Sequence, residues 1–248
     1  MDDQGIRRSP RQTRYSGGQD GILDCCVAYN QYGGYCVPLS AIKRPAVQKI
    51  LEGEVYEPDT IAFMREHGRG GDIVHAGTFF GDFLPAISHA CDDESIVWAL
   101  EPNPHSFRCA QATVAINGLS NIKLANAGLG SQREELPFQI FDQQGTSLGG
   151  LSQFVKGGNA SRDDCVMASV VRMDDLIPPS RRVGIIQLDV EGYEEQSLMG
   201  AIETIRRCRP ILILETEISE FWLRATLPGI VYRSMTKLHT NTVYFPAE

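Results

Sequence analysis

The chain has 248 residues, of which 42% are hydrophobic and 22% charged, and this fits one large α/β domain with a short additional N-terminal segment. Its formal net charge is −8. A surface of that sign repels phosphate backbones, so we expect no nucleic acid among its partners.

The seven cysteines are scattered and include no C-x-x-C pair, so the sequence indicates neither a zinc site nor a disulfide framework. Free thiols fit a reducing compartment. The sequence shows no signal-peptide pattern and no apolar stretch with the length of a membrane span. We therefore expect a cytoplasmic protein without a membrane span.

The chain divides into three parts by pattern. Residues 1–20 are polar and rich in Arg, Gly, Ser and Gln, and we expect them to form a disordered arm. Residues 21–69 are predicted to form an N-terminal helical lid segment. Residues 70–248 are predicted to form the main domain.

Two local signals lie in the lid segment. A Tyr/Gly/Cys cluster covers Tyr29–Cys36, and its pair Gly33 and Gly34 indicates a turn. Helical patterns follow, the later one over 60–66 with Asp59 as its expected N-cap.

Apolar strands alternate with amphipathic helices through the main domain, except for an insertion at about 130–171 around the glycine-rich stretch 145–158. Strands this apolar are covered on both faces, which predicts an α/β fold with a mostly parallel sheet. Such sheets bind ligands beyond the carboxyl ends of their strands. The predicted strands cover 72–76, 96–100, 122–127, 185–188 and 211–214, the helices cover 82–90, 105–117 and 194–207, and further β-like runs cover 136–141, 165–171, 230–234 and 242–245.

A glycine-rich turn, Gly77-Thr78-Phe79-Phe80-Gly81-Asp82, follows the first of these strands. Glycine lets the backbone turn sharply and approach a ligand closely. The same pattern fits a plain strand-to-helix turn, so both interpretations stay open. No Lys-Ser or Lys-Thr pair follows Gly81, so this is not a triphosphate-binding loop.

Glu101 ends the second predicted strand and begins the run Glu101-Pro102-Asn103-Pro104. A carboxylate at this place commonly accepts hydrogen bonds from both ribose hydroxyls of an adenosine cofactor. The alternative is an exposed loop carboxylate. The third strand ends in Asn126-Ala127-Gly128, small residues that leave room for an adenine ring.

Two later strands bring carboxylates to the same edge of the sheet. Asp189 ends one of them, with Glu191 and Glu194 close behind, and Glu215 ends the other. Asp189 and Glu215 can serve as a proton acceptor, as polar anchors or as part of a divalent-metal site. The structural alternatives are helix capping for Asp189 and a solvated strand end for Glu215.

The ordered motifs are Tyr56-Glu57-Pro58, Gly77-x-x-x-Gly81-Asp82, Glu101-Pro102-Asn103-Pro104, Asn117-Gly118-Leu119, Leu188-Asp189-Val190-Glu191-Gly192 and Arg209-Pro210-Ile211. Over about residues 46–217 this set resembles the FkbM family of S-adenosylmethionine (SAM)-dependent methyltransferases. The resemblance implies a Rossmann-like class I fold with a mostly parallel seven-stranded sheet and helices on both faces. It also implies SAM as cofactor, S-adenosylhomocysteine (SAH) as product, and methyl transfer to a hydroxyl of a sugar, glycan or polyketide-type secondary metabolite.

The chain departs from the family at two places in the implied cofactor site. Family members usually carry an acid at the position of His75 and Ala-Asn at that of Thr78-Phe79. His75 is expected either to bond to the methionine end of the cofactor or to be a buried neutral histidine. The implied cofactor-binding residues are Glu57, His75, Gly77, Thr78, Phe79, Gly81, Asp82, Glu101, Pro102, Asn103, Asn126, Ala127, Gly128 and Asp189.

Asp189 and His239 are the candidates for the base that receives the hydroxyl proton. His239 precedes the last strand in a loop, where a surface histidine is the alternative. We expect no metal, because the fifth strand ends in Glu215-Thr216 where an Asp-Asn pair would be required, and because an isolated alcohol chelates poorly. The expected partner is a small-molecule or carbohydrate acceptor, and a homo-oligomer stays open.

Two other functions stay open. An NAD(P)-dependent oxidoreductase uses a similar sheet, but Phe79 occupies the place where the G-x-G-x-x-G pattern needs its middle glycine. A non-catalytic SAM-binding adaptor would use the cluster Tyr32–Tyr35 as a contact surface. The presence of both Glu101 and Asp189 favours an enzyme.

Overall fold

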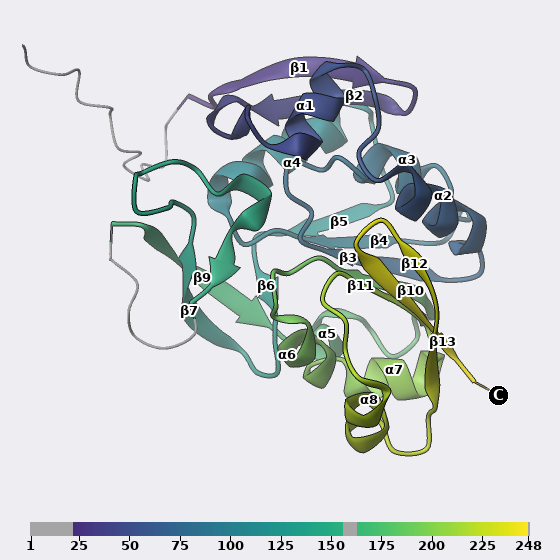
Figure 1. Cartoon of the computed structure of the whole chain (residues 1–248). Helices are drawn as coiled ribbons and strands as arrows, with labels where there is room; N and C mark the ends of the chain where they lie inside the picture. The colour runs from purple at the N-terminus through teal and green to yellow at the C-terminus, as the bar shows by residue number, and fades with distance from the viewer. Residues whose placement is uncertain (1–21, 156–162, 248) are drawn as a thin grey trace, which may run out of the picture.

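The structure, a computed structural model, describes residues 22–155 and 163–247. The expected disordered arm, residues 1–20, lies outside the described residues, as does the end of the glycine-rich stretch, residues 156–158. The described chain forms a main sheet of seven strands, a second sheet of four strands and an N-terminal hairpin (Figure 1).

The main sheet buries both faces of its central strands, as the apolar runs predict. Along β3, for example, Ile73 packs into the core cluster of one face and Val74 into that of the other. The strand order is β12-β13-β11-β10-β3-β4-β5, with β10, β11, β3, β4 and β5 parallel and β12 and β13 antiparallel, so the sheet is mixed. The bounds are β3 Asp72–Ala76, β4 Val97–Leu100, β5 Ile122–Ala125, β10 Val183–Leu188, β11 Ile211–Leu214, β12 Tyr232–Leu238 and β13 Asn241–Pro246.

Helices cover both faces of this sheet (Figure 1). The strand order reverses between β3 and β10, and the crevice at such a reversal is where open α/β sheets bind ligands. No helix within residues 22–155 and 163–247 has both the length and the apolar composition of a membrane span.

One face of the main sheet carries α2 Pro58–His67, α3 Leu84–Ser88 and α4 Pro104–Ile116. The other face carries α5 Met173–Leu176, α6 Glu194–Met199, α7 Ile202–Cys208 and α8 Glu220–Thr226.

Two helix predictions require correction. The helix predicted over 82–90 is only α3, because Gly81 has a left-handed φ of 83° and the helix begins three residues later, at Leu84. The helix predicted over 194–207 is divided at Gly200 into α6 and α7. A Cβ at Gly200 would lie 1.9 Å from the Gly130 carbonyl oxygen, so the glycine permits the close contact that accompanies the break.

The N-terminal segment contains a β-hairpin as well as helices. Strands β1 Cys25–Asn30 and β2 Gly33–Pro38 pair antiparallel through a turn at residues 31–32, so the turn predicted at Gly33 and Gly34 was wrong. These glycines instead admit Asn117: a Cβ at Gly33 would lie 2.0 Å from Asn117 Oδ1, which accepts a 2.9 Å hydrogen bond from the Gly34 N–H.

The remaining short elements of this segment are the 3-10 turn η1 Leu39–Ala41 and the helix α1 Pro45–Leu51. The next helix, α2, begins at Pro58, and Glu57 occupies its N-cap position with a left-handed φ of 48°. Asp59 lies in the first turn, so the prediction that Asp59 is the N-cap was wrong.

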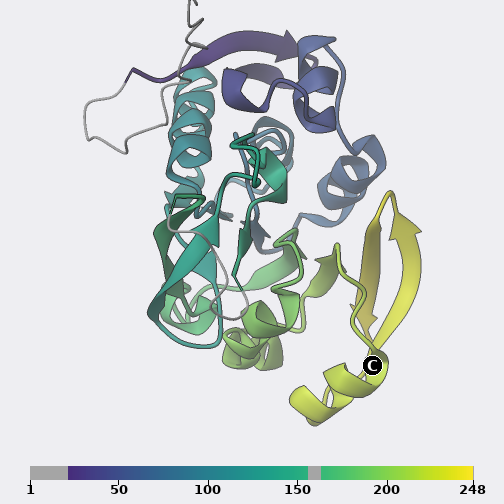
Figure 2. The same ribbon diagram turned by 60° about the vertical axis from the view of Figure 1, so that its left-hand side comes forward.

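The insertion forms the second sheet, which lies to the left of the main sheet in Figure 1 and toward the viewer in Figure 2. The β-like runs predicted over 136–141 and 165–171 are its longest strands. A 3-10 turn, η2 Gly149–Leu151, precedes the last short strand of the described glycine-rich stretch. The sheet order is β6-β9-β7-β8, with bounds β6 Gly128–Leu129, β7 Glu134–Gln139, β8 Gln153–Phe154 and β9 Cys165–Val171.

Candidate functional site

A cavity opens at the carboxyl ends of β3, β4 and β10 and beside the segment that follows β5. The main sheet supplies one wall, and the insertion supplies the facing wall. Seven of the residues expected at the cofactor line it: Gly77, Phe79, Glu101, Pro102, Ala127, Gly128 and Asp189. Its other lining residues are Ala76, Leu100, Leu129, Phe138, Gly149, Gly150, Ser152, Phe154 and Val190.

Gly77 is required where β3 and β10 end side by side. Its φ is 85°, and a Cβ at this position would lie 1.7 Å from the carbonyl oxygen of Asp189. A side chain here would therefore push apart the two loops that carry Gly77 and Asp189. The glycine-rich turn is both a tight turn and a wall of the cavity, which joins the two interpretations left open by the sequence.

Phe79 has a left-handed φ of 52°, a conformation that costs energy in a residue with a large side chain. Two contacts hold it there. Its backbone N–H donates a 2.8 Å hydrogen bond to Glu101 Oε2, and its ring lies against the insertion, 3.2 Å from where a Cβ of Gly149 would be. Gly149 also has a positive φ, 55°, so glycine is needed where the insertion covers Phe79.

Glu101 is 6% exposed and accepts hydrogen bonds from two backbone N–H groups. Besides Phe79, the N–H of Asn103 donates to Oε1 at 2.7 Å. Burial nevertheless raises the pKa of Glu101 to about 8. Asn103 caps α4 by accepting from His105 N at 3.0 Å, and Asn126 Nδ2 donates to the Glu101 carbonyl oxygen at 2.7 Å. Asn103 and Asn126 therefore shape the loops around Glu101 and do not line the cavity.

We expect the affinity for SAH to rise with pH between about pH 6 and 8 and to level off above that range. Hydroxyl donors of a ligand favour the ionised carboxylate, whereas the free protein holds a proton on Glu101 below its pKa of about 8. Binding then releases that proton, and the affinity increases by up to about tenfold per pH unit. Calorimetry of SAH binding in buffers of different ionisation enthalpy measures both the affinity and the number of protons released. Glu101→Gln should flatten the dependence of SAH affinity on pH. An unchanged pH dependence in this variant would contradict a role for the Glu101 carboxylate in SAH binding.

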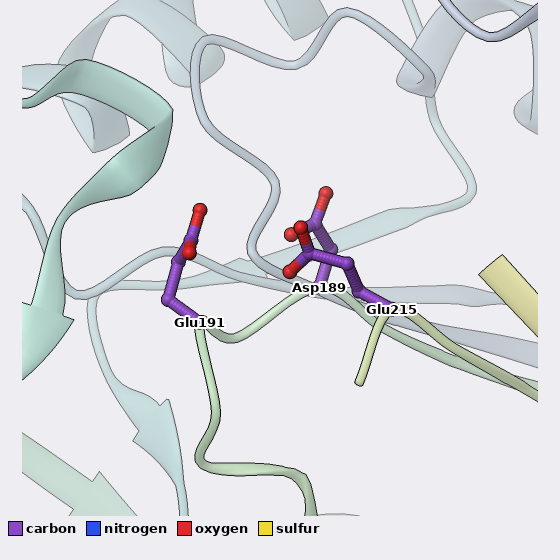
Figure 3. A group of neighbouring side chains, drawn as sticks. All are labelled: Asp189, Glu191 and Glu215. Atoms are coloured by element: carbon purple, nitrogen blue, oxygen red, sulfur yellow. The ribbon is translucent and has the colours of Figure 1, made fainter. Parts of the chain in front are cut away.

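Three carboxylates from two loops meet next to the cavity: Asp189, Glu191 and Glu215 each place an oxygen within 4.8 Å of the others. Figure 3 shows the carboxylates of Asp189 and Glu215 facing each other and that of Glu191 across from them. Burial and the neighbouring Glu215 raise the pKa of Asp189 well above its usual value, and burial followed by Glu215 raises that of Glu191 to about 7.

This geometry offers oxygen ligands of the kind that a divalent cation binds. The sequence indicated Asp189 and Glu215 but gave Glu191 no share in the site. Glu191 has a left-handed φ of 52°, and its side chain rises on the same side as the carboxylates of Asp189 and Glu215 (Figure 3). The only sequence signal was the glycine that follows it, Gly192, whose φ is 83°.

His75, Thr78, Gly81 and Asp82 do not line the cavity. His75 is 2% exposed, stacks on Phe83 with 5.2 Å between ring centroids and bonds through Nδ1 to Gln187 Oε1. Burial lowers its pKa to about 4, so it is neutral, one of the two states that the sequence left open. Thr78 Oγ1 donates to the His75 carbonyl at 3.0 Å inside the turn that ends at Gly81. Burial raises the pKa of Asp82 to about 7.

Glu57 and His239 lie together beside the carboxylates and away from the cavity lining. Glu57 Oε2 accepts from Thr60 Oγ1 at 3.0 Å and from Asn241 Nδ2 at 2.6 Å, and Oε1 is 4.0 Å from His239 Nε2. The Tyr56 ring meets the His239 ring edge-on at 5.7 Å. Burial, then Glu57 and Asp189, raises the pKa of Tyr56 to about 12. Glu57 therefore ties the β12–β13 turn to the start of α2.

The chain is similar to known methyltransferases. Residues 75–238 match the methyltransferase FkbM domain, and no curated protein matches the chain. Among solved structures, a methyltransferase FkbM from Methylobacillus flagellatus KT is 19% identical with a TM-score of 0.46, covering 71% of this chain and 43% of its own. This chain thus spans less than half of that protein.

Two further structures cover more of their own length. A SAM-dependent methyltransferase from Aquifex aeolicus is 13% identical with a TM-score of 0.43, covering 83% of this chain and 94% of its own. The O-methyltransferase TomG from Streptomyces achromogenes, solved with SAM, is 10% identical with a TM-score of 0.44, covering 76% and 78%. Because the match to the FkbM domain extends over about two thirds of the 248 residues, the chain belongs to the FkbM family of methyltransferases, whose methyl donor is SAM.

Proposed function

We propose that the protein transfers the methyl group of SAM to a hydroxyl oxygen of a small-molecule or carbohydrate acceptor, either a sugar or glycan or a polyketide-type metabolite. The observation that carries this proposal is the pairing in one cavity of Glu101, at the end of β4, with Asp189, at the end of β10. One carboxylate suits the binding of a ribose, and the other suits the removal of a proton.

The cavity residues fit this cofactor. Glu101 offers carboxylate oxygens to ribose hydroxyls, and Asp189 offers a side-chain oxygen as a polar anchor. Leu129, Pro102 and the Phe154 ring give the opposite part of the cavity an apolar lining suited to adenine. Gly128 packs against the Phe154 ring. A Cβ at this position would lie 2.5 Å from the ring, so a larger residue would displace it.

SAM supplies an electrophilic methyl carbon on a good leaving group, so the protein has mainly to orient the acceptor and exclude water. Phe79 and the insertion residues Gly149 and Phe154 cover the cavity from the side opposite the sheet. Asp189 would receive the hydroxyl proton of the acceptor. A raised pKa suits this role, since it makes the ionised carboxylate a stronger base.

We expect SAM and SAH to bind with micromolar dissociation constants, about −8 kcal/mol. Calorimetry with SAH, followed by a screen of hydroxylated acceptors with methyl-labelled SAM, tests the proposal in two steps. Absence of heat and of thermal stabilisation at millimolar SAM would remove the cofactor assignment. Binding of SAH combined with no transfer to any sugar or alcohol would favour the non-catalytic adaptor instead.

We expect methyl transfer to continue in excess EDTA. Burial and the neighbouring Glu215 raise the pKa of Asp189 well above its usual value, so a proton competes with a cation for this carboxylate. An isolated alcohol adds only one oxygen ligand. Turnover is measured after dialysis against EDTA, with and without added Mg²⁺. Loss of activity with recovery on Mg²⁺ would assign Asp189, Glu191 and Glu215 to a metal site.

A further inference from the structure

The insertion covers the cavity with a short segment, residues 147–152, which we call the roof segment. Gly149, Gly150 and Ser152 of this segment line the cavity on the side that faces the main sheet. Gly149 has a positive φ of 55°, and glycine loses more conformational freedom on ordering than any other residue. Contacts from outside the insertion therefore matter for keeping the roof segment over the cavity.

The backbone hydrogen bonds of the roof segment are mostly local. The Leu148 N–H donates to the Ile140 carbonyl at 2.9 Å, within the insertion. The N–H groups of Leu151 and Ser152 donate to the carbonyls of Leu148 and Gly149, at 3.0 and 3.2 Å, within the segment itself. These bonds set the shape of the turn, but they do not attach it to the rest of the protein.

The N-terminal segment supplies the attachment. Arg44 Nη2 donates a 2.9 Å hydrogen bond to the Ser147 carbonyl, more than 100 residues later. A Cβ at Gly149 would lie 3.1 Å from Ala41 Cβ and 3.2 Å from Arg44 Cγ. The guanidinium therefore holds the start of the roof segment, while the apolar stem of the same side chain packs near Gly149.

Arg44 is well placed to act as an anchor, because its own backbone is fixed. It occupies the N-cap position of α1 with an extended ψ of 141°, and the following Pro45 favours this conformation in the residue before it. Its N–H donates to the Ala41 carbonyl at 2.8 Å. The Arg44 side chain is half-buried. The anchor point on the N-terminal segment is thus defined by local structure.

The contacts continue from the roof segment to the carboxylate assigned to the ribose. On its other side, a Cβ at Gly149 would lie 3.2 Å from Phe79 Cζ. The Phe79 N–H donates to Glu101 Oε2 at 2.8 Å. Arg44 precedes residues 75–238, which match the methyltransferase FkbM domain, so the family match gives this side chain no role.

We propose that Arg44 is a positioning residue for the cofactor: it holds the roof segment over the cavity and so slows the release of SAM and SAH. This inference rests on the proposed cofactor cavity. Arg44 touches neither cofactor nor acceptor in this role, and its effect passes through the Ser147 carbonyl and Gly149. Its loss should therefore change cofactor retention and leave the transfer step itself nearly unaffected.

The binding test compares Arg44→Met with Lys43→Gln. Methionine keeps an apolar stem beside Gly149 but removes the N–H donors, and Lys43→Gln removes the neighbouring exposed positive charge. Arg44→Met should raise the dissociation rate and the Kd of SAH by about tenfold, and the KM for SAM similarly, with kcat within about threefold. Lys43→Gln should behave as wild type. Wild-type SAH affinity in Arg44→Met, or a lower kcat with unchanged KM, would overturn the proposal.

Amide hydrogen exchange without ligand tests the roof segment directly. Arg44→Met should accelerate exchange at residues 147–152, with the thermal midpoint of unfolding nearly unchanged. Weaker SAH binding with unchanged exchange there would mean that Arg44 contacts the ligand itself, and the positioning role would be wrong. If the wild-type protein binds no SAH, the proposed function fails, whereas the exchange comparison still decides whether Arg44 holds the roof segment.

Discussion

Asp189→Asn is expected to lower the turnover number at least tenfold while the affinity for SAH stays within a factor of about three. Asparagine has nearly the same shape and keeps a side-chain oxygen, but it cannot accept the proton of an acceptor hydroxyl. A tenfold loss corresponds to about 1.4 kcal/mol of transition-state stabilisation, the lower end of what a missing general base removes. Steady-state kinetics with the identified acceptor, together with SAH calorimetry, measures the two effects separately.

The matched control is Glu217→Gln, which removes an exposed carboxylate two residues beyond Glu215 that pairs with Lys237 at 2.8 Å. We expect wild-type turnover in this variant. The pH profile adds a second criterion. Wild-type turnover should rise with pH as Asp189 ionises, because burial and Glu215 raise its pKa, and this limb should disappear in Asp189→Asn. An unchanged kcat in Asp189→Asn would exclude it as the base and leave His239 as the candidate.

Glu101→Ala is expected to weaken SAM and SAH binding by about 1.5–3 kcal/mol, because two ribose hydroxyls would lose a charged acceptor. In affinity this is roughly 10- to 150-fold. The measurement is calorimetry at about pH 8.5, above the pKa of about 8 that burial gives Glu101, so that the wild-type carboxylate is mostly ionised.

A structural effect of this substitution must be separated from the loss of a ligand contact. Glu101 also accepts from the backbone N–H groups of Phe79 and Asn103, so alanine leaves two buried donors unpaired. Glu101→Gln keeps an acceptor for one of them and should still lose about tenfold in affinity. Thermal unfolding of both variants without ligand reports the structural part. Wild-type affinity in a folded Glu101→Gln protein would remove this carboxylate from the cofactor site.

The amino-acid sequence by itself determined the central strands and the edge of the sheet at which the site lies. An apolar run such as Ile73-Val74 needs cover on both faces wherever it lies, and the residue after the strand must then emerge at the sheet edge. Gly77, Glu101 and Asp189 were located by this local rule, and all three line the cavity. The match to the FkbM domain likewise follows from ordered local motifs.

Other features were decided by contacts between segments far apart in the chain. Gly33 and Gly34 were predicted to form a turn, but they instead leave space for the side chain of Asn117, more than 80 residues later. The Glu57 carboxylate bonds to Asn241, 184 residues away, and lies near His239. No local pattern contains these partners, because only the tertiary fold brings them together.

Asp189 and Glu191, both in the loop after β10, show the same difference between local and tertiary control. Asp189 could be located from its strand, since a strand's direction fixes where its end emerges. The direction of the Glu191 side chain depends on a left-handed φ of 52°, which local preference disfavours for a residue other than glycine. Only the tertiary structure decided it, because the packing and hydrogen bonds of the two loops outweigh the backbone preference of a single residue.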